Sequence, residues 1–234
     1  MHAGTRASRT PENTGSIESA MASYYARRAE EYELIFRKPE RQNDLHALRN
    51  FVVETFAGKN VLEIACGTGY WTQLLACSAA SVTATDVNDE VLEIARAKPQ
   101  VQTNVELRRE DAYALPSFPQ RFSGGLAGFW WSHVPKARLR PFLTGLHRAF
   151  APGATMVFLD NAYVQGSSTP ISRRDADGNT YQRRTLSDGS THEVLKNFPT
   201  EEELRYALSG LARNVKVGFL PHFWVLMYIP MING

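Results

Sequence analysis

Cysteine is scarce in this chain, and its two thiols cannot build a disulfide framework. Cys66 and Cys77 form neither a CxxC pair nor a spacing typical of zinc sites. Long apolar runs are also missing: none approaches the roughly 20 residues that a membrane-spanning helix needs, and the first residues lack the apolar block of a secretory signal. We therefore expect a cytoplasmic protein with no membrane partner.

An excess of charge of one sign is absent as well. The 26 lysines and arginines and the 24 aspartates and glutamates are mixed along the 234 residues and leave a formal net charge of +2. Because nucleic-acid-binding proteins gather basic residues in a patch or stripe, a nucleic-acid partner is not expected. A hydrophobic content of 43% over this length is sufficient for one globular domain with its own core.

Five segments of the chain differ in pattern. Residues 1–18 contain almost no apolar side chains, which predicts a flexible tail. Residues 19–57 place apolar side chains at helical spacing and predict a cap of two amphipathic helices. Short apolar strands alternate with helices in residues 59–160, which predicts a doubly wound, mostly parallel α/β sheet with the cofactor-binding core. Residues 161–198 are polar and glycine-marked, which predicts a hairpin insertion that serves as a lid, with a surface hairpin as the alternative. Residues 199–234 predict a helix and closing strands.

The stretch "VLEIACGTGYW", residues 61–71, reads as a buried strand followed by a glycine turn. A dinucleotide-binding turn needs a third glycine so that the backbone can approach a pyrophosphate, but Thr72 occupies that position. An ionised Glu63 before the turn would also repel a pyrophosphate, whereas it suits a ligand with a cationic amino group. The turn therefore argues against a nicotinamide dinucleotide.

This stretch resembles the first motif of class I S-adenosylmethionine-dependent methyltransferases, E/D-x-G/A-x-G-x-G, with Glu63, Ala65, Gly67 and Gly69 in the motif positions. Ala65 replaces the first glycine, a variant familiar in ubiquinone/menaquinone-type small-molecule methyltransferases. The resemblance implies a Rossmann-like sheet of seven mostly parallel strands with the last strand antiparallel. It also implies S-adenosylmethionine (SAM) as cofactor and S-adenosylhomocysteine (SAH) as product.

Further positions agree with the resemblance. Asp86 ends the second predicted strand, 17 residues after Gly69, where the family's acidic residue accepts hydrogen bonds from both ribose hydroxyls. Asp111 and Ala112 follow the third strand, where the family binds the adenine, although the adjacent Glu110 could take the acidic role. The other cofactor contacts expected from the resemblance are Trp71, Val87, Phe129 and Tyr25. Alternatively, Glu63 is a buried acid whose hydrogen bonds are made within the protein, and Asp86 caps a helix.

Aromatic side chains crowd the end of the fourth predicted strand, where the family's acceptor site begins. Trp130 and Trp131 are expected to bind a planar acceptor, with core packing as the alternative for at least one of them. Tyr24, in the first helix, and Tyr163, in the insertion, are further candidate acceptor contacts. His133 is the candidate general base because its unperturbed pKa lies near neutrality; the alternative is a structural or merely polar role.

Two arginines of the first helix leave a choice open. Arg27 and Arg28 could meet an anionic acceptor, but solvated charges are the favoured interpretation. No H-x-x-H or H-E-x-x-H cluster is present, and we expect catalysis without a metal.

Together, these features predict an enzyme that moves a methyl group from SAM to an O or N atom of a small, planar or aromatic metabolite. We expect a monomer or homodimer. The alternatives are a SAM-binding module without turnover and a methyltransferase of protein or nucleic acid.

Overall fold

The computed structural model describes residues 14–99 and 104–232. Helix α1 (Thr14–Arg27) begins inside the segment expected to be a tail, and residues 1–13 of that segment lie outside the described part. No helix within the described ranges is long and apolar enough to cross a membrane.

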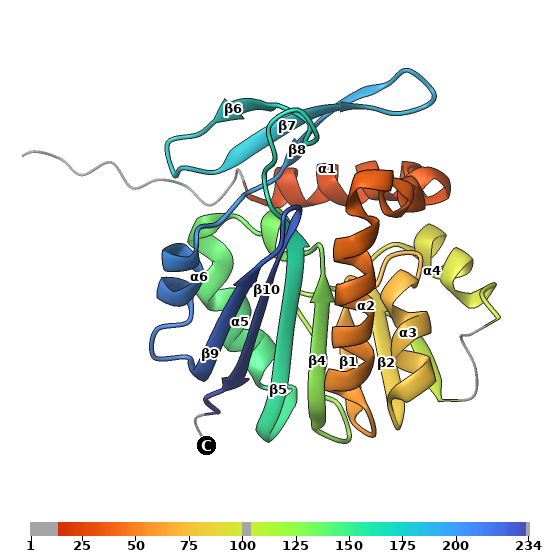
Figure 1. Ribbon diagram of the computed structural model, residues 1–234, viewed down its shortest axis with the longest axis vertical. Coiled ribbons are helices and arrows are strands. Elements are labelled where there is room, and N and C mark those ends of the chain that lie inside the picture. The colour runs from red at the N-terminus through yellow and green to blue at the C-terminus, as the bar shows by residue number, and fades with distance from the viewer. Residues whose placement is uncertain (1–13, 100–103, 233–234) are drawn as a thin grey trace, which may run out of the picture.

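A seven-stranded sheet forms the centre of the molecule (Figure 1), in the order β3-β2-β1-β4-β5-β10-β9. Its strands are β1 (Asn60–Ile64), β2 (Ser81–Asp86), β3 (Val105–Arg109), β4 (Phe122–Gly128), β5 (Phe150–Asn161), β9 (Ala212–Phe219) and β10 (Phe223–Pro230). Strands β1 to β5 pair in parallel, and β10 pairs antiparallel with both β5 and β9. The predicted topology is therefore confirmed. The strand order reverses between β1 and β4, and ligands of such sheets bind outside the carboxyl ends of the strands at this point.

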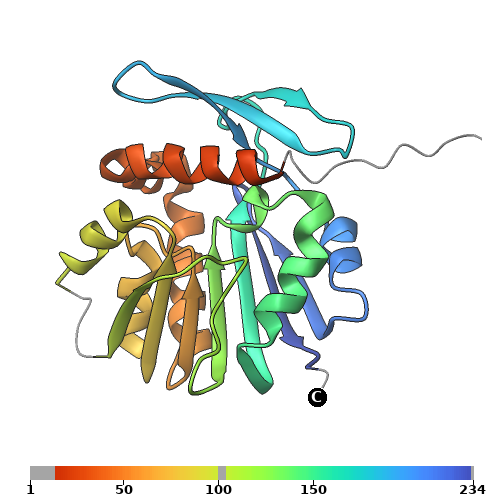
Figure 2. The ribbon, with the colours of Figure 1, turned by 180° about the vertical axis from the view of Figure 1, so that it is seen from behind.

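Helices cover both faces of the sheet (Figures 1 and 2). The α-helices after α1 are α2 (Gln42–Phe56), α3 (Tyr70–Ser78), α4 (Asp89–Arg96), α5 (Leu139–His147) and α6 (Glu201–Ala207). Four 3₁₀ helices join them, η2 (Ala29–Arg37), η3 (Pro39–Arg41), η4 (Trp131–His133) and η5 (Lys136–Arg138). One core cluster packs α2 and α3 on the sheet, and a second packs α5 and α6 on the opposite face. The capping box at the start of α6 forms as expected, with Thr200 and Glu203 exchanging hydrogen bonds.

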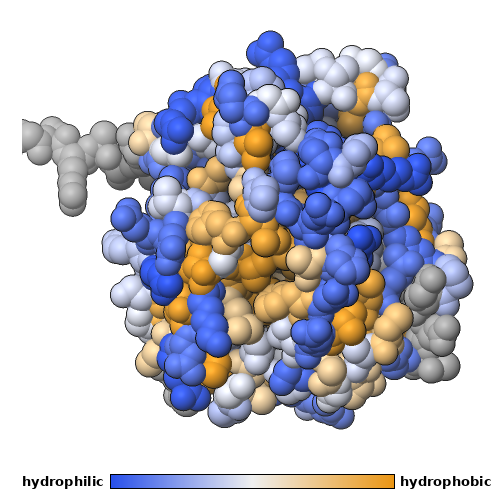
Figure 3. All heavy atoms as spheres, in the orientation of Figure 1, coloured by the Kyte–Doolittle hydropathy of each residue, from blue (hydrophilic) through white to orange (hydrophobic). Residues whose placement is uncertain are grey.

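Apolar side chains reach the surface on the α2 face of the sheet (Figure 3). They gather over β9 and β10, where Val225, Met227 and Ile229 stay half-buried, while the alternate β10 side chains Trp224, Leu226 and Tyr228 are buried. This alternation follows from the two-residue period of a strand that has a helix against one face only.

The insertion folds into a separate antiparallel sheet of β6 (Ile171–Arg174), β7 (Thr180–Thr185) and β8 (Thr191–Leu195). It has one strand more than the expected hairpin. Met21 and Tyr24 of α1 pack against Val194 and Leu195 of this small sheet. Helix α1 thus lies between the small sheet and the carboxyl ends of the main sheet (Figures 1 and 2), where both elements close over the strand-order reversal.

Candidate functional site

A cavity of about 270 Å³ opens at the carboxyl ends of β1, β2 and β4. Most of the predicted cofactor contacts lie on its wall, namely Ala65, Gly67, Asp86, Val87, Asp111, Ala112, Phe129 and Tyr25. Trp130 lies here too, although the sequence predicts it on the acceptor side. Helix α1 closes the cavity with Ser19, Met21 and Ala22. We call it the cofactor cavity.

The turn after β1 has backbone angles that favour glycine. Gly67 and Gly69 have φ of +55° and +78°, and Ala65 itself adopts φ of +50°. A Cβ on Gly69 would lie 3.0 Å from Cβ of Ala95, so this glycine lets the turn approach α4 rather than forming the cavity wall. Gly67 leaves room, since the nearest atom to an added Cβ is 4.0 Å away, on Tyr32.

Asp86 connects the turn to the end of β2. Its Oδ2 accepts a hydrogen bond from the Gly67 amide at 2.9 Å, and its Oδ1 accepts one from the Asn88 amide at 3.0 Å. Burial raises the pKa of Asp86, and the backbone amides that bond to it act in the opposite direction. A carboxylate oxygen has a second lone pair, so Asp86 can still accept hydrogen bonds from ribose hydroxyls at the cavity wall.

Glu63 lies beneath the turn and is not on the cavity wall. Its side chain is buried, and Oε2 accepts a hydrogen bond from the Thr72 hydroxyl at 2.7 Å, while Oε1 has no partner. Burial raises the pKa of Glu63 to about 8. Asp86, on the cavity wall at the end of β2, fits the ribose of SAM, whereas Glu63 acts only from below the turn, off the cavity wall.

A second cavity, of about 330 Å³, adjoins the first and is called here the acceptor cavity. Tyr24 lies on its wall, as do residues of η2, η3, the loop after β5 and the small sheet. Tyr25, Tyr32, Phe129 and His133 line both cavities. These four side chains therefore form the junction at which two bound molecules would meet.

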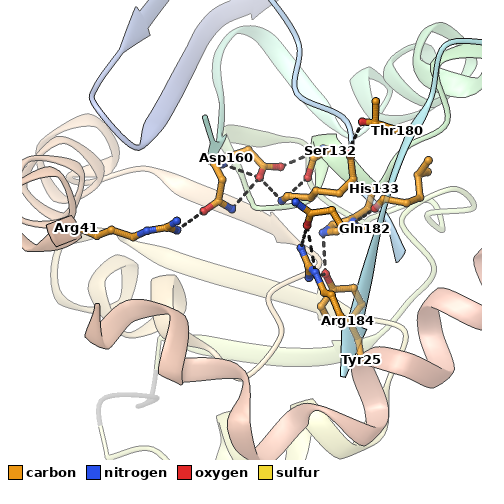
Figure 4. Close-up of polar contacts among 11 residues, drawn as sticks. Tyr25, Arg41, Ser132, His133, Asp160, Thr180, Gln182 and Arg184 are labelled. Atoms are coloured by element: carbon orange, nitrogen blue, oxygen red, sulfur yellow. Dashed lines mark hydrogen bonds and ion pairs between the residues drawn. The ribbon is translucent and has the colours of Figure 1, made fainter. Parts of the chain in front are cut away.

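His133 and Tyr25 form a hydrogen-bonded pair at this junction (Figure 4). His133 Nδ1 lies 2.6 Å from the carbonyl oxygen of Leu195, which can only accept, so Nδ1 carries the hydrogen. Nε2 then accepts from the Tyr25 hydroxyl at 2.8 Å. Burial, and next the positive charge of Lys196, hold the pKa of His133 well below its usual range, so the imidazole is neutral.

Besides Glu63 and Gly69, three further predicted contacts lie away from both cavities, which corrects those expectations. Trp71 is buried against Phe36 and Phe129 in the core, because α3 turns this face toward the sheet. Trp131 is buried against Phe158 and Trp224, because η4 directs its indole to the α5 side of the sheet. Tyr163 is 37% exposed and packs on Phe198; it is on neither cavity wall.

Arg41 and Arg184, which the sequence interpretation missed, line the acceptor cavity together with Lys196 of the insertion. Arg28, interpreted as solvated, lies on the same wall. Lys196 is buried and donates to Asp160 Oδ1 at 2.7 Å and to Ser132 Oγ at 2.6 Å (Figure 4). Burial lowers the pKa of Lys196 to about 8. These residues come from distant segments, so no local motif marks them. The sequence feature that could have indicated a basic site is the pair of arginines in "YQRRTL" of the insertion.

Metal-ligating side chains do not gather anywhere in residues 14–99 and 104–232: no group of three or more His, Cys, Asp or Glu side chains could hold an ion there.

Comparison with known proteins gives consistent results. A family model described as a methyltransferase domain matches residues 61–153. The chain is 32% identical over 108 residues to a demethylmenaquinone methyltransferase of Staphylococcus aureus (strain MRSA252), across 45% of this chain and 44% of the relative. The match thus spans less than half the length of the curated relatives.

Similarity to solved structures covers more of the chain. Structures described as a DhpI-SAH complex and a DhpI-SAM-HEP complex align with TM-scores of 0.76 and 0.75 at 29% and 28% identity. The alignments cover 93% and 95% of this chain and 98% and 100% of theirs. Residues 61–153 thus match the methyltransferase domain family, and the sheet topology and glycine turn agree with the class I S-adenosylmethionine-dependent fold that the sequence resembles.

Proposed function

We propose that the protein transfers a methyl group from SAM to an O or N atom of a small molecule. The observation that carries the proposal is the junction of Tyr25, Tyr32, Phe129 and His133, which both cavities share. Such a junction brings a methyl donor and an acceptor into contact inside a protein shell, and positioning supplies much of the acceleration of a displacement reaction.

The chain's residues divide the work between them. When bound, SAM supplies a methyl group on a sulfonium, and the electron pair of the broken C–S bond stays on sulfur as SAH forms. Asp86 holds the ribose, and Glu63 supports the turn from below through its hydrogen bond with Thr72. Tyr32 and Phe129 exclude water at the junction.

His133 is proposed as the general base for an acceptor that arrives with its proton. Because Nε2 accepts from Tyr25, the proton would pass from the acceptor to the Tyr25 oxygen while the Tyr25 hydrogen moves to Nε2.

The elements that cover the acceptor cavity favour a small acceptor over a macromolecule. Helix α1 and the small sheet lie over it, and its volume is in the range of small-molecule sites. The pocket-wall aromatics Tyr24, Tyr25 and Phe129 support the planar or aromatic acceptor that the sequence predicts. The expected cytoplasmic location and the monomeric or dimeric state stay predictions.

The test is incubation with methyl-labelled SAM and a size-fractionated lysate. Enzyme-dependent label below a small-molecule cut-off supports the proposal, and mass analysis then identifies the product. Label above the cut-off alone would make the protein a methyltransferase of macromolecules. If calorimetry detects SAM binding but no fraction is labelled, the protein is a SAM-binding module without turnover.

A further inference from the structure

The acceptor cavity has a strong excess of positive charge. Six arginines and lysines lie on its wall, against one carboxylate, Glu31. Glu31 bonds to the backbone and hydroxyl of Ser187 through the same oxygen, and Lys196 is neutralised by Asp160. The remaining cations on the wall make no ion pair with a carboxylate in the described part of the chain.

Arg184 lies beside the junction. Its Nη2 and Nε donate to Oε1 of Gln182 at 2.7 and 3.3 Å, and its Nη1 lies 3.5 Å from the Tyr25 hydroxyl (Figure 4). Gln182 is buried and fixes the guanidinium without neutralising it. Because Tyr25 lines both cavities, Arg184 places a positive charge beside the position of the reacting groups.

Arg41 is buried at the other side of the cavity, with 6% of its surface exposed. Its Nη1 donates to Asn161 Oδ1 at 2.9 Å and its Nη2 to Ser167 Oγ at 3.4 Å, both neutral acceptors. The Nε has no partner. Glu40 and Asp44 attract this charge without accepting a hydrogen bond from it. A buried guanidinium whose hydrogen-bond acceptors are neutral is stabilised further when an anion completes the site.

Arg28 contributes a third guanidinium, which is half-buried on the cavity wall. It lies 5.9 and 5.5 Å from the ring centres of Tyr24 and Tyr32, so aromatic faces hold it in place and leave its donors for a ligand. Arg28 lies between α1 and η2, Arg41 ends η3 and Arg184 lies in β7, so the three arginines converge only in the folded molecule.

We propose that the methyl acceptor carries an oxyanion group, a carboxylate or a phosphate-type group, held by Arg184, Arg41 and Arg28. The planar fork of a guanidinium matches two oxygens of such a group, whereas a neutral planar acceptor would leave three guanidinium groups without an ion-pair partner. This inference rests on the proposed function, because it names the acceptor class of the same site.

Direct binding tests the charge recognition without turnover. The protein saturated with SAH is titrated calorimetrically with inorganic phosphate and, separately, with acetate. We expect at least one anion to bind saturably and Arg184→Gln to weaken it tenfold or more. The control is Arg173→Gln: Arg173 belongs to the same small sheet but pairs with Glu193 away from both cavities. Unchanged SAH affinity of both variants shows that they fold.

The anion that binds identifies the acceptor group. Binding of phosphate alone indicates a phosphate-type acceptor, and binding of acetate alone indicates a carboxylate acceptor. If neither binds, or if Arg173→Gln weakens binding as much as Arg184→Gln, the inference is overturned.

A second experiment separates this inference from the proposed function. The small-molecule fraction of a lysate is passed over an anion-exchange resin, and both the retained and the unretained pools are incubated with enzyme and methyl-labelled SAM. Label from the retained pool supports an anionic acceptor. Label from the unretained pool alone overturns the inference but leaves the methyltransferase function standing. If neither pool is labelled, the proposed function fails, and the titration alone decides whether the cavity binds oxyanions.

Discussion

Gly128 at the end of β4 lies directly against the indole of Trp71 on α3. A Cβ on Gly128 would be 2.6 Å from both Cδ1 and Nε1 of the indole, which is buried and cannot move aside freely. Gly128 also lines the cofactor cavity. The contact therefore connects core packing to the shape of the binding site.

Gly128→Ala should lower the free energy of unfolding by about 1–3 kcal/mol, because the added methyl overpacks this contact. Urea denaturation measures the change. The matched control is Gly145→Ala in α5, where an added Cβ has nothing within 4 Å and should be neutral or stabilising by up to about 1 kcal/mol. Equal stability of the two variants would contradict the proposed clash.

Ala65→Gly should raise the free energy of unfolding by about 0.5–1 kcal/mol. Ala65 has φ of +50°, and glycine removes the steric cost of that backbone conformation while adding entropy to the unfolded chain. Ala76→Gly, inside helix α3, should instead destabilise by a similar amount. Chemical denaturation of both variants gives the sign, and a loss of stability at both positions would refute the strain at Ala65.

Asp86→Ala should weaken SAM binding by about 1.5–3 kcal/mol, or one to two decades in affinity, through the loss of charge-assisted hydrogen bonds. Calorimetric titration with SAM is the measurement. Asp89→Ala is the control, because Asp89 pairs with Arg109 at the surface and lies on neither cavity wall. Unchanged affinity in Asp86→Ala would remove Asp86 from the site.

His133→Ala should reduce the methylation rate about a hundredfold with SAM affinity preserved, if the acceptor arrives protonated. Since burial holds the pKa of His133 below 6.5, the wild-type rate should show no break near that pH and should fall only in more acidic solution, as the base protonates. His46→Ala, on the exposed side of α2, is the control. An unchanged rate in His133→Ala would leave catalysis to positioning alone.

Glu63 should make the stability of the ligand-free protein fall as pH rises. Burial raises the pKa of Glu63 from 4.5 to about 8, so between these values the folded state holds a proton that the unfolded state releases. The stabilisation is complete below the unfolded pKa and is lost toward pH 8, by a few kcal/mol in order of magnitude. In Glu63→Gln this loss should disappear from urea unfolding measured between about pH 5 and 8; parallel pH profiles of the two proteins would contradict it.

The sheet and the cofactor cavity were predictable because their signals are local. Each strand is a short apolar run, and the residues after β1, β2 and β3 reach the cavity simply because parallel strands end at one edge. Asp86 and Asp111 were named from the resemblance to the methyltransferase motifs, and both lie on the cavity wall.

The acceptor cavity was not predictable in the same way. Arg41, Arg184 and Lys196 belong to segments that meet only through tertiary packing, and β6 has a polar sequence without a strand pattern. The sequence also does not predict in which direction the side chains after β4 point. Helix η4 turns Trp131 into the core, while Trp130 reaches the cofactor cavity.

Helix α1 contributes to both cavities, with Met21 on the cofactor side and Tyr24 on the acceptor side. Its amide hydrogens exchange with solvent only when the helix opens, and a molecule that contacts both α1 and the main sheet makes that opening more costly. The rate of hydrogen–deuterium exchange along α1 therefore shows whether the site is occupied. Exchange is slow when a ligand is bound and fast after it leaves.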